Sequence, residues 1–421
     1  MTDHSLLLED PPGGWMQARL DDICRRVQDA ALPSANGQRL YLGLEHLASG
    51  LPTLVGRGKE SDVRSGKTTF RKDDILFGKL RPYLRKSVLV SEDGICSTDI
   101  LVFRATEKCI PEFLCFLTHT DEFVGHAKNT TSGVQHPRTS WAALREFKLS
   151  VPPLPEQRKI AAVLGLVQQA IEQQERLIAL TMKLKKTLLH QLFTQGLRGE
   201  PQKQTEIGPV PESWEELPLE KAGEVVYGIQ AAVASSLKPV GTMILTNKNI
   251  TLDGNIVLEK INYFVLKTKR HHETVLKKGD LLFNWRSGSK EHVGKTAYFD
   301  LAGEFVHSSF ILRIRPSDEV TGRYLFYYLN FLRESGVFLK KQTFSINAKF
   351  NKSAINELPT YLPGEEERRE IVGALDAVDM KLEVLQAKRH LIEDLFRTLL
   401  QQLMTARIRV DDLDVQEIDD E

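Results

Sequence analysis

Four cationic side chains lie within eight positions of one another, directly after a short apolar run at residues 75–77. They are Lys79, Arg81, Arg85 and Lys86. An arginine can donate two parallel hydrogen bonds to guanine, and both arginine and lysine can neutralise phosphates. The spacing therefore makes this cluster a candidate contact for DNA, with scattered charge on a solvated surface as the alternative.

A second group of the same chemical type follows another apolar run much later in the chain. It contains Asn284, Arg286 and Lys290, with Trp285 among them. An asparagine can bind adenine at two points, as an arginine binds guanine, so these residues are also candidates for contact with bases. Trp285 could either pack within the domain or stack on a base.

Two polar loops, at residues 130–138 and 343–349, add further candidates for contact with DNA. Their side chains carry the donors and acceptors that base recognition uses. The candidates are Gln135, His136 and Arg138 in the first loop, and Asn347 and Lys349 in the second. An ordinary surface loop is the alternative for both segments.

No pattern in the sequence predicts catalysis or a bound metal. Residues 58–68 resemble a phosphate-binding loop, but seven residues separate the glycines where that loop has four. The basic run 267–272 fits a solvated face, and adjacent histidines on a strand would point to opposite faces. Because Cys/His ligand spacing, an Asn/Asp-Pro-Pro-Tyr motif and a nuclease carboxylate–lysine cluster are all missing, we expect no cofactor in this chain.

The charge balance is neutral. The 421 residues include 56 Lys and Arg against 56 Asp and Glu. A free-standing DNA-binding protein is usually basic, because phosphate neutralisation supplies much of its affinity. Neutrality therefore favours segregation of charge, as the acidic C-terminal tail suggests, or a partner that supplies positive surface.

Composition predicts a cytoplasmic protein that does not associate with membranes. No apolar stretch approaches the roughly 18 residues of a membrane span, and the N-terminus lacks the pattern of a signal peptide. The cysteines form no Cys-x-x-Cys pair and are expected to be reduced core thiols. They are Cys24, Cys96, Cys109 and Cys115.

The chain contains an internal repeat with an offset of 211 residues. Glu156–Ile160 aligns with Glu367–Ile371, and the same offset places Arg104 on Arg315 without a gap. Further upstream the offset drifts, and Asp74 aligns with Asp280. Agreement across both a helix and the preceding globular part predicts a tandem of two similar units.

Each unit is predicted to be a mixed domain of strands and short helices, followed by one long helix. Strands are expected at residues 86–90, 100–103 and 305–314, and short helices at 111–118 and 322–333. The fold class is therefore α+β, with two similar mixed α/β domains separated by two long helices.

The two long helices carry apolar residues that step by three and four, the pattern of a coiled coil. The first seam contains Ile160, Leu164, Val167, Ile171, Ile178, Leu188 and Leu192. The second seam contains Ile371, Leu375, Val378, Leu382, Leu385, Ile392, Phe396, Leu399 and Leu403. An antiparallel coiled coil within one chain buries both seams, and a coiled-coil homodimer is the alternative.

These features resemble the specificity (S) subunits of type I restriction–modification systems, over nearly the whole chain. The resemblance rests on Pro-Pro-Leu-Pro-Glu-Gln-Arg-Lys-Ile-Ala at 152–161, on the helix ending at 188–194 and on Asp-Asp-Ile-Leu-Phe-Gly-Lys-Leu-Arg-Pro-Tyr at 73–83. The second copy departs from the family, because it reads Gly-Glu-Glu-Glu-Arg at 364–368.

The resemblance implies a domain plan. It comprises target-recognition domain 1 at 1–151, spacer helix 1 at 152–195, a linker at 196–213, target-recognition domain 2 at 214–362, spacer helix 2 at 363–406 and an acidic tail at 407–421.

The resemblance also implies a role without catalysis. Each target-recognition domain would read one half of a bipartite, asymmetric site in double-stranded DNA, and the helices would set the spacer. Two modification (methylase) subunits would dock on the helices and bring S-adenosylmethionine. Restriction (translocase/nuclease) subunits would use ATP and Mg²⁺.

Two other functions stay open at this point. One is a single-chain DNA methyltransferase or nuclease with an unrecognised active site. The other is a coiled-coil scaffold that does not contact nucleic acid.

Overall fold

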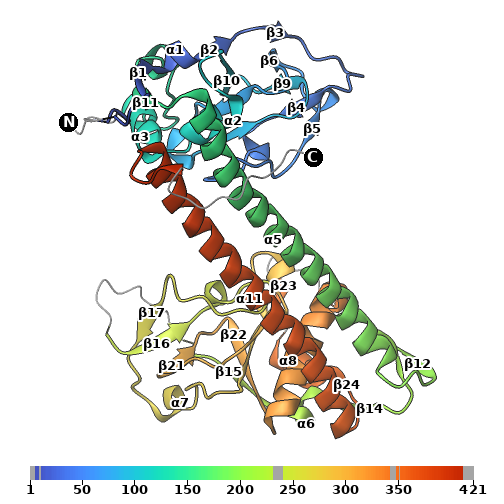
Figure 1. Cartoon of the computed structure of the whole chain (residues 1–421). Helices are drawn as coiled ribbons and strands as arrows, with labels where there is room; N and C mark the ends of the chain where they lie inside the picture. Colours follow the sequence, from blue (N-terminus) through green and yellow to red (C-terminus); the bar gives the residue numbers. More distant parts are fainter. Residues whose placement is uncertain (1–4, 9–10, 231–239, 342–347, 350, 411–421) are drawn as a thin grey trace. The chain divides into compact units, whose positions relative to one another are not determined.

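The structure, a computed structural model, describes residues 5–8, 11–230, 240–341, 348–349 and 351–410. The chain divides into two compact units, unit 1 with Met1–Leu177 and Leu385–Glu421, and unit 2 with Ile178–Val384. The long helices α5 (Leu154–Gln195) and α11 (Glu365–Met404) each contribute to both units (Figure 1).

Unit 1 is built around a four-stranded antiparallel sheet. Strand β10 lies inside the sheet and pairs with β2 and β7, and β7 also pairs with β8. Every residue of β7 is buried, which explains the continuous apolar run in the sequence. The strands are β2 (Cys24–Val27), β10 (Ile100–Ala105), β7 (Ile75–Gly78) and β8 (Ser87–Leu89).

A second sheet of unit 1 has five strands in the order β3–β6–β9–β4–β5, with β4 parallel to β9. A separate pair, β1–β11, brings the two ends of the globular part together. The strands are β3 (Ala30–Ala31), β6 (Lys67–Phe70), β9 (Gly94–Cys96), β4 (Leu40–Leu42), β5 (Gly58–Lys59), β1 (Met16–Arg19) and β11 (Lys148–Val151).

The helices of the unit 1 globular part are short. They are α1 (Leu20–Ile23), α2 (Pro111–Leu117), α3 (Asp121–Asn129) and α4 (Trp141–Leu144). Helix α3 was not predicted from the sequence, although Thr120 caps it by accepting a hydrogen bond from the Phe123 N–H.

Unit 2 repeats this topology. Its four-stranded sheet has the order β15–β22–β18–β20, and β16 lies parallel to β21 as β4 does to β9. The pair β14–β24 corresponds to β1–β11. The strands are β15 (Gly223–Tyr227), β22 (Ile311–Pro316), β18 (Leu281–Asn284), β20 (Thr296–Tyr298), β17 (Asn262–Phe264), β16 (Thr242–Leu245), β21 (Phe305–His307), β14 (Glu215–Pro218) and β24 (Pro359–Leu362).

The helices of the unit 2 globular part include one long element, α8, whose inner face is almost entirely buried. Asp318 caps α8 by accepting a hydrogen bond from the Thr321 N–H at 2.8 Å. The helices are α6 (Leu219–Ala222), α7 (Lys269–His272), α8 (Glu319–Glu334), α9 (Val337–Lys341) and α10 (Lys352–Asn356).

A buried ion pair recurs at the same place in both units. Arg104 donates to both carboxylate oxygens of Asp74, at 2.6 and 2.7 Å. Arg315 binds Asp280 with the same two distances. Both aspartates are 1% exposed, so each carboxylate depends on its arginine for compensation. The sequence repeat therefore reflects a repeated structural contact.

Helices α5 and α11 pack antiparallel within each unit. In unit 1 the Gln174 side chain donates to the Leu385 carbonyl at 2.9 Å, and in unit 2 Lys185 pairs with Asp379 at 2.5 Å. The residues of both predicted seams are buried or half-buried. The predicted fold class, α+β with two similar domains and an antiparallel coiled coil, is confirmed.

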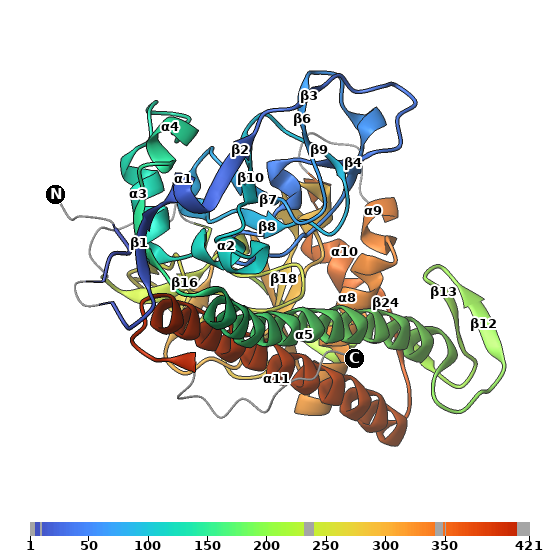
Figure 2. The same cartoon turned by 45° about the horizontal axis from the view of Figure 1, so that its top comes forward.

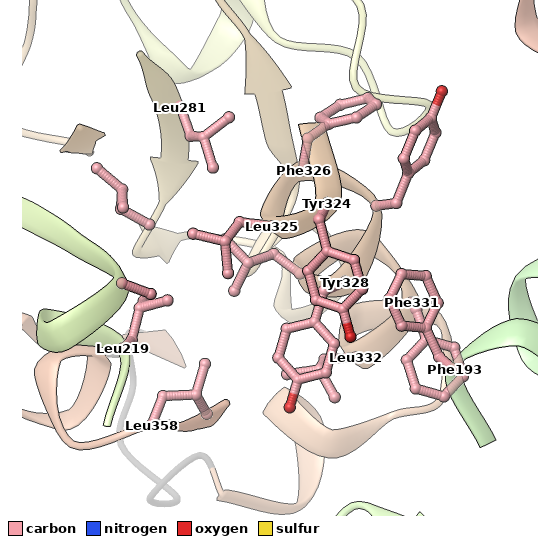
Figure 3. Packing of buried hydrophobic residues seen from close by; sticks show 14 of the residues in the cluster. Phe193, Leu219, Leu281, Tyr324, Leu325, Phe326, Tyr328, Phe331, Leu332 and Leu358 are labelled. Atoms are coloured by element: carbon pink, nitrogen blue, oxygen red, sulfur yellow. The ribbon is translucent and has the colours of Figure 1, made fainter. Parts of the chain in front are cut away.

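Aromatic packing attaches the end of α5 to unit 2. Phe193 stacks on Phe331 of α8, with ring centroids 5.2 Å apart, and meets Tyr324 edge-on at the same distance. Figure 3 shows these rings in one buried cluster with Tyr328 and Leu332. The helix therefore ends as part of the hydrophobic core of this unit.

The segment predicted as a linker, 196–213, is more ordered than the sequence indicated. It forms a hairpin of β12 (Gln202–Thr205) and β13 (Gly208–Pro211), which is visible in Figure 2 beyond the end of α5. Val210 is fully buried in the unit 2 core, so apolar contacts fix the hairpin. Glu206 and Ile207 make the turn between the strands, and Gly208 follows the turn with a φ of 117°, which favours glycine.

The start of the predicted acidic tail, 407–410, packs against unit 1. Arg409 binds Glu156 through two hydrogen bonds, at 2.9 and 3.2 Å, and Val410 is 4% exposed. The remaining tail residues, 411–421, lie outside the described residues.

Candidate nucleic-acid interface

The structure brings the two basic segments of unit 1 together. Leu80 forms an antiparallel β-bridge with Arg138, the Arg81 N–H donates to the Pro137 carbonyl at 2.8 Å, and the Thr139 N–H donates to the Lys79 carbonyl at 3.1 Å. Residues 79–81 and 137–139 therefore lie side by side, although 58 positions separate Leu80 from Arg138 in the sequence. We call these two stretches the paired segments of unit 1.

A strained turn follows the first paired segment. Arg81 and Arg85 both have a φ of 51°, in the left-handed region that non-glycine residues rarely adopt. Between them lies the 3-10 helix η3 (Pro82–Leu84), in which Pro82 is buried. Arg81 is exposed at this turn, which suits contact with DNA, and strain of this kind gathers at functional sites.

Arg85 and Lys86 have partners within unit 1. The Arg85 guanidinium donates to the His119 carbonyl at 3.0 Å and pairs with Asp121, and the Lys86 ammonium donates to the Leu44 carbonyl at 2.6 Å. Both side chains are half-buried. They hold the turn in place, and this contrasts with the predicted role as direct DNA contacts.

The Arg138 guanidinium is held by a carboxylate. Arg138 Nε donates to Asp99 Oδ1 at 2.8 Å, and Nη2 lies 3.4 Å from Asp99 Oδ2. Hydrogen bonds from Arg138 lower the pKa of Asp99, so this carboxylate stays ionised at neutral pH. Arg138 is nevertheless 43% exposed, which leaves part of its charge toward solvent.

The loop before Arg138 is closed and exposed. Two backbone hydrogen bonds link Ser132 and Arg138, at 2.9 and 3.0 Å, and Gly133 makes the turn with a φ of 89°. Gln135 and His136 are exposed at the tip. Their position is compatible with the predicted contact with DNA.

Unit 2 contains an equivalent pair of segments. Strand β19 (Arg286–Ser287) pairs with β23 (Ala348–Lys349), and the register places Arg286 opposite Lys349. This is the counterpart of the bridge between Leu80 and Arg138. We call β19 and β23 the paired segments of unit 2. Asn347 lies outside the described residues.

Two aromatic rings and a hydroxyl hold Arg286. Its guanidinium carbon lies 4.9 Å from the centroid of Trp285 and 4.2 Å from that of Phe310, and Nη2 donates to Ser309 Oγ at 3.2 Å. The Trp285 indole N–H donates to the Ser309 carbonyl at 2.7 Å. Trp285 is therefore a packing residue that also supports a candidate DNA contact.

The prediction for Asn284 needs correction. Its side chain is completely buried, and its amide donates to the His292 carbonyl at 2.6 Å. Asn284 is the last residue of β18, which is buried on both faces, so this amide is not presented to a base. Lys290, in the 3-10 helix η5 (Lys290–His292), is exposed.

The basic run 267–272 folds differently from the strand that the sequence analysis assumed. Lys269–His272 form helix α7, capped by Thr268. The run is mostly exposed, as expected for a solvated face. Within the described ranges no group of three or more His, Cys, Asp or Glu is placed to hold a metal.

The four cysteines are free and buried. Burial raises the pKa of Cys96, Cys109 and Cys115 to about 12, which leaves them as unreactive thiols at neutral pH. No helix in the described part of the chain has the length and apolar character to cross a bilayer.

The residues that hold the two arginines, Asp99 and Phe310, were not among the predicted site residues. They stand at the same position of the 211-residue repeat, directly before β10 and β22. The repeat offset was the available signal. The offset alone did not mark these two positions as functional, because a carboxylate and a phenyl ring share no chemistry.

The structure defines a class of protein by its elements. Two topologically equivalent α+β domains each carry paired segments with an arginine, and both domains continue into long helices that pack antiparallel. A family model described as the type I restriction modification DNA specificity domain matches residues 12–182 and 211–394. Because these matches include most of the chain, the protein belongs to this family.

Known specificity subunits are similar to this chain over nearly its whole length. The type I restriction enzyme MjaVIII specificity subunit of Methanocaldococcus jannaschii is 23% identical, over 96% of this chain and 95% of that subunit. A solved structure from work on assembly and conformational transition of the type I R-M system aligns at a TM-score of 0.59 and 22% identity, over 94% of this chain and 99% of the other.

The S subunit of the type I restriction-modification system from M. genitalium aligns at a TM-score of 0.57 and 13% identity, over 96% of this chain and 99% of that one. At these identities the structural alignments support the fold.

Proposed function

We propose that this chain is the DNA sequence-specificity subunit of a type I restriction–modification complex, without catalytic activity of its own. Each domain reads one half of a bipartite, asymmetric site in double-stranded DNA. The long helices set the number of unread base pairs between the halves and carry the modification subunits.

The occurrence of the same paired segments in both domains carries this proposal. In each unit, two segments that are distant in sequence meet by β-pairing, and an arginine lies at the bridge. Arginine is the side chain that most often specifies guanine in the major groove. One reading surface per domain is what a two-part site requires.

Exposed leucines on the long helices support docking of two identical partners. Leu180 and Leu184 of α5, in unit 2, are 57% exposed each. The repeat offset of 211 residues places them on Leu391 and Leu395 of α11, in unit 1, which are 70% and 48% exposed. An i, i+4 pair of exposed leucines at equivalent positions suits one docking site per unit for a modification subunit.

The neutral net charge fits a subunit that binds DNA within a complex. Phosphate contacts supply much of the affinity of DNA-binding proteins, and they require excess positive charge. The formal charge of this chain is zero, so the partners would supply much of that surface. They would also supply S-adenosylmethionine for methylation of an adenine extruded from the duplex, and ATP and Mg²⁺ for restriction.

A methylation assay tests the proposal. The full chain is combined with its modification subunit and S-adenosylmethionine, a library of random-sequence duplexes is added, and the methylated molecules are sequenced. We expect a motif of two short specified halves at a fixed separation. A complex that methylates without sequence preference contradicts the proposal. Methyl transfer or DNA cleavage by the purified chain alone would favour a single-chain enzyme.

A further inference from the structure

The paired segments of the two units differ in which of the two segments carries the arginine. In unit 1 the bridge joins Leu80 to Arg138, and in unit 2 it joins Arg286 to Lys349. Leu80 and Arg286 stand at equivalent places, two residues after the last residue of β7 and of β18. The arginine therefore belongs to opposite segments in the two units.

Asp99 in unit 1 and Phe310 in unit 2 stand at equivalent positions of the repeat, and each contacts the arginine of its own unit. Asp99 binds the side chain of Arg138 on the later segment, through Nε and Nη2. Phe310 lies 4.2 Å from the guanidinium of Arg286 on the earlier segment. A carboxylate and an aromatic face can each orient a guanidinium, the first by hydrogen bonds and the second by stacking.

Both contacts leave a hydrogen-bonding edge available. Asp99 occupies the Nε–Nη2 side of Arg138, and Nη1 donates only a long hydrogen bond, 3.5 Å, to the His136 carbonyl, while the side chain is 43% exposed. Among the described residues Arg286 donates one hydrogen bond, from Nη2 to Ser309 Oγ, and its Nε is buried without a partner, so the Nη1–Nη2 end is the edge that a base could meet. A planar guanidinium with a free edge can donate two hydrogen bonds to guanine.

We propose that each domain reads one guanine with a pre-positioned arginine, Arg138 in unit 1 and Arg286 in unit 2, and that residues 99 and 310 act as the positioning residues that determine which paired segment supplies it. This inference rests on the proposed function. Fixing the side chain before binding reduces the conformational entropy lost on contact with the base. The two half-sites would then each contain a guanine, read by arginines that arrive from different segments.

The methylation assay with the reconstituted complex also tests this inference, one half-site at a time. We expect Arg286→Ala to reduce the preference for guanine at one position of one half-site by about tenfold or more. Arg138→Ala should do the same in the other half-site. In each variant the opposite half-site should remain unchanged.

Lysine variants separate base reading from phosphate contact. Arg138→Lys and Arg286→Lys keep the positive charge but lose the planar guanidinium that the carboxylate and the aromatic ring orient. We therefore expect both to lose guanine preference, as the alanine variants do. Retained preference in the lysine variants contradicts the inference. Arg270→Ala, in the exposed run of α7, is the matched control and should leave both half-sites intact.

Variants of the positioning residues give an independent readout. Phe310→Leu removes the aromatic face, whereas Phe310→Tyr keeps it, so only the first should weaken guanine preference in the half-site read by Arg286. Asp99→Ala should weaken preference in the other half-site. Phe310 is 40% exposed and Asp99 is 29% exposed, so neither change opens a core cavity.

The possible results distinguish this inference from the proposed function. If at least one half of the wild-type motif specifies no guanine, this inference is wrong, but the proposed function is not affected. A uniform fall in methylation that leaves the motif of the arginine variants unchanged has the same meaning, because that is the behaviour of a phosphate contact. A wild-type complex that selects no bipartite motif overturns both.

Discussion

At the scale of single residues, the buried ion pair between Asp74 and Arg104 links β10 to the residue that directly precedes β7. Asp74 also accepts a hydrogen bond from the Arg71 N–H at 2.8 Å. We expect Arg104→Ala to lower the free energy of unfolding of unit 1 by about 3 kcal/mol, because it leaves a buried carboxylate without its cation. Hydrogen exchange followed by mass spectrometry measures this for each unit separately.

Arg145→Ala provides the control for this prediction. Arg145 pairs with Glu146 at 3.0 Å, but both side chains are about half exposed, at 51% and 46%. An exposed pair of this kind contributes about 0–1 kcal/mol. If both variants lose the same free energy of unfolding, the Asp74–Arg104 pair stabilises unit 1 no more than an exposed ion pair does.

His119 predicts a pH dependence of stability in unit 1. The imidazole is buried and Nε2 lies 3.0 Å from the Ser87 carbonyl, and desolvation lowers its pKa from 6.5 to about 4. Below pH 6.5 the unfolded state binds more protons than the folded state, so stability falls as the pH falls toward 4. Across this window we expect a loss of about 3 kcal/mol.

Unfolding by urea at several pH values checks this prediction. His119→Gln keeps a donor for the Ser87 carbonyl and removes the titration, so its stability should depend less on pH between 6.5 and 4. His272→Gln, at an exposed position of α7, should behave as the wild type does. A pH profile that is the same in all three proteins argues against a buried neutral imidazole.

Residue chemistry alone singled out Arg138 and Arg286 as candidate contacts for bases, but it did not predict their surroundings. Arg138 and Arg286 were recognisable because arginine after a strand or in a polar loop suits guanine. Asn284 had equally suitable chemistry, yet the sequence did not reveal that the end of β18 is buried on both faces. Burial depends on the other elements that cover a strand, so it follows from tertiary packing.

At the scale of elements, the long helices were predictable because their pattern is local. Leu164 and Leu375 belong to seams that repeat every three and four residues, and both are fully buried. Short elements gave weaker signals: α3 and α7 have 9 and 4 residues. In such short segments few apolar positions recur, so periodicity cannot separate helix from strand.

The leucine pairs on the helices predict a stoichiometry. Leu391→Ser with Leu395→Ser changes only the proposed docking site in unit 1, so we expect the variant to bind one modification subunit where two are proposed for the wild type. Leu180→Ser with Leu184→Ser should do the same through unit 2. These side chains are exposed, so we expect the stability of the free chain to change by less than about 0.5 kcal/mol per substitution.

Mass measurement of the reconstituted complexes reads out this stoichiometry, and Lys186→Ser, at an exposed position of α5, is the control. Two modification subunits on either leucine variant would place the docking site elsewhere. Loss of both subunits from a single pair of substitutions would mean that the two sites are not independent.

At the scale of the whole molecule, α5 and α11 each contribute to both units, so under the proposed function we expect their length to set the spacer. The test inserts one heptad into α5 after Gln174 and one into α11 after Leu385, two residues that contact each other in unit 1. Seven residues keep both seams in register and lengthen each helix by about 10 Å. We expect the methylated motif to keep both halves and gain about three base pairs of spacer, at about 3.4 Å per base pair.

The control for this insertion replaces the seven residues before Gln174 and the seven before Leu385 with the same heptads, without a change in length. It should methylate the original motif, which separates an effect of length from an effect of sequence. An unchanged spacer in the longer protein, with methylation intact, would mean that the helices do not set the distance. In that case contacts between the modification subunits and the DNA would have to fix the separation of the two half-sites.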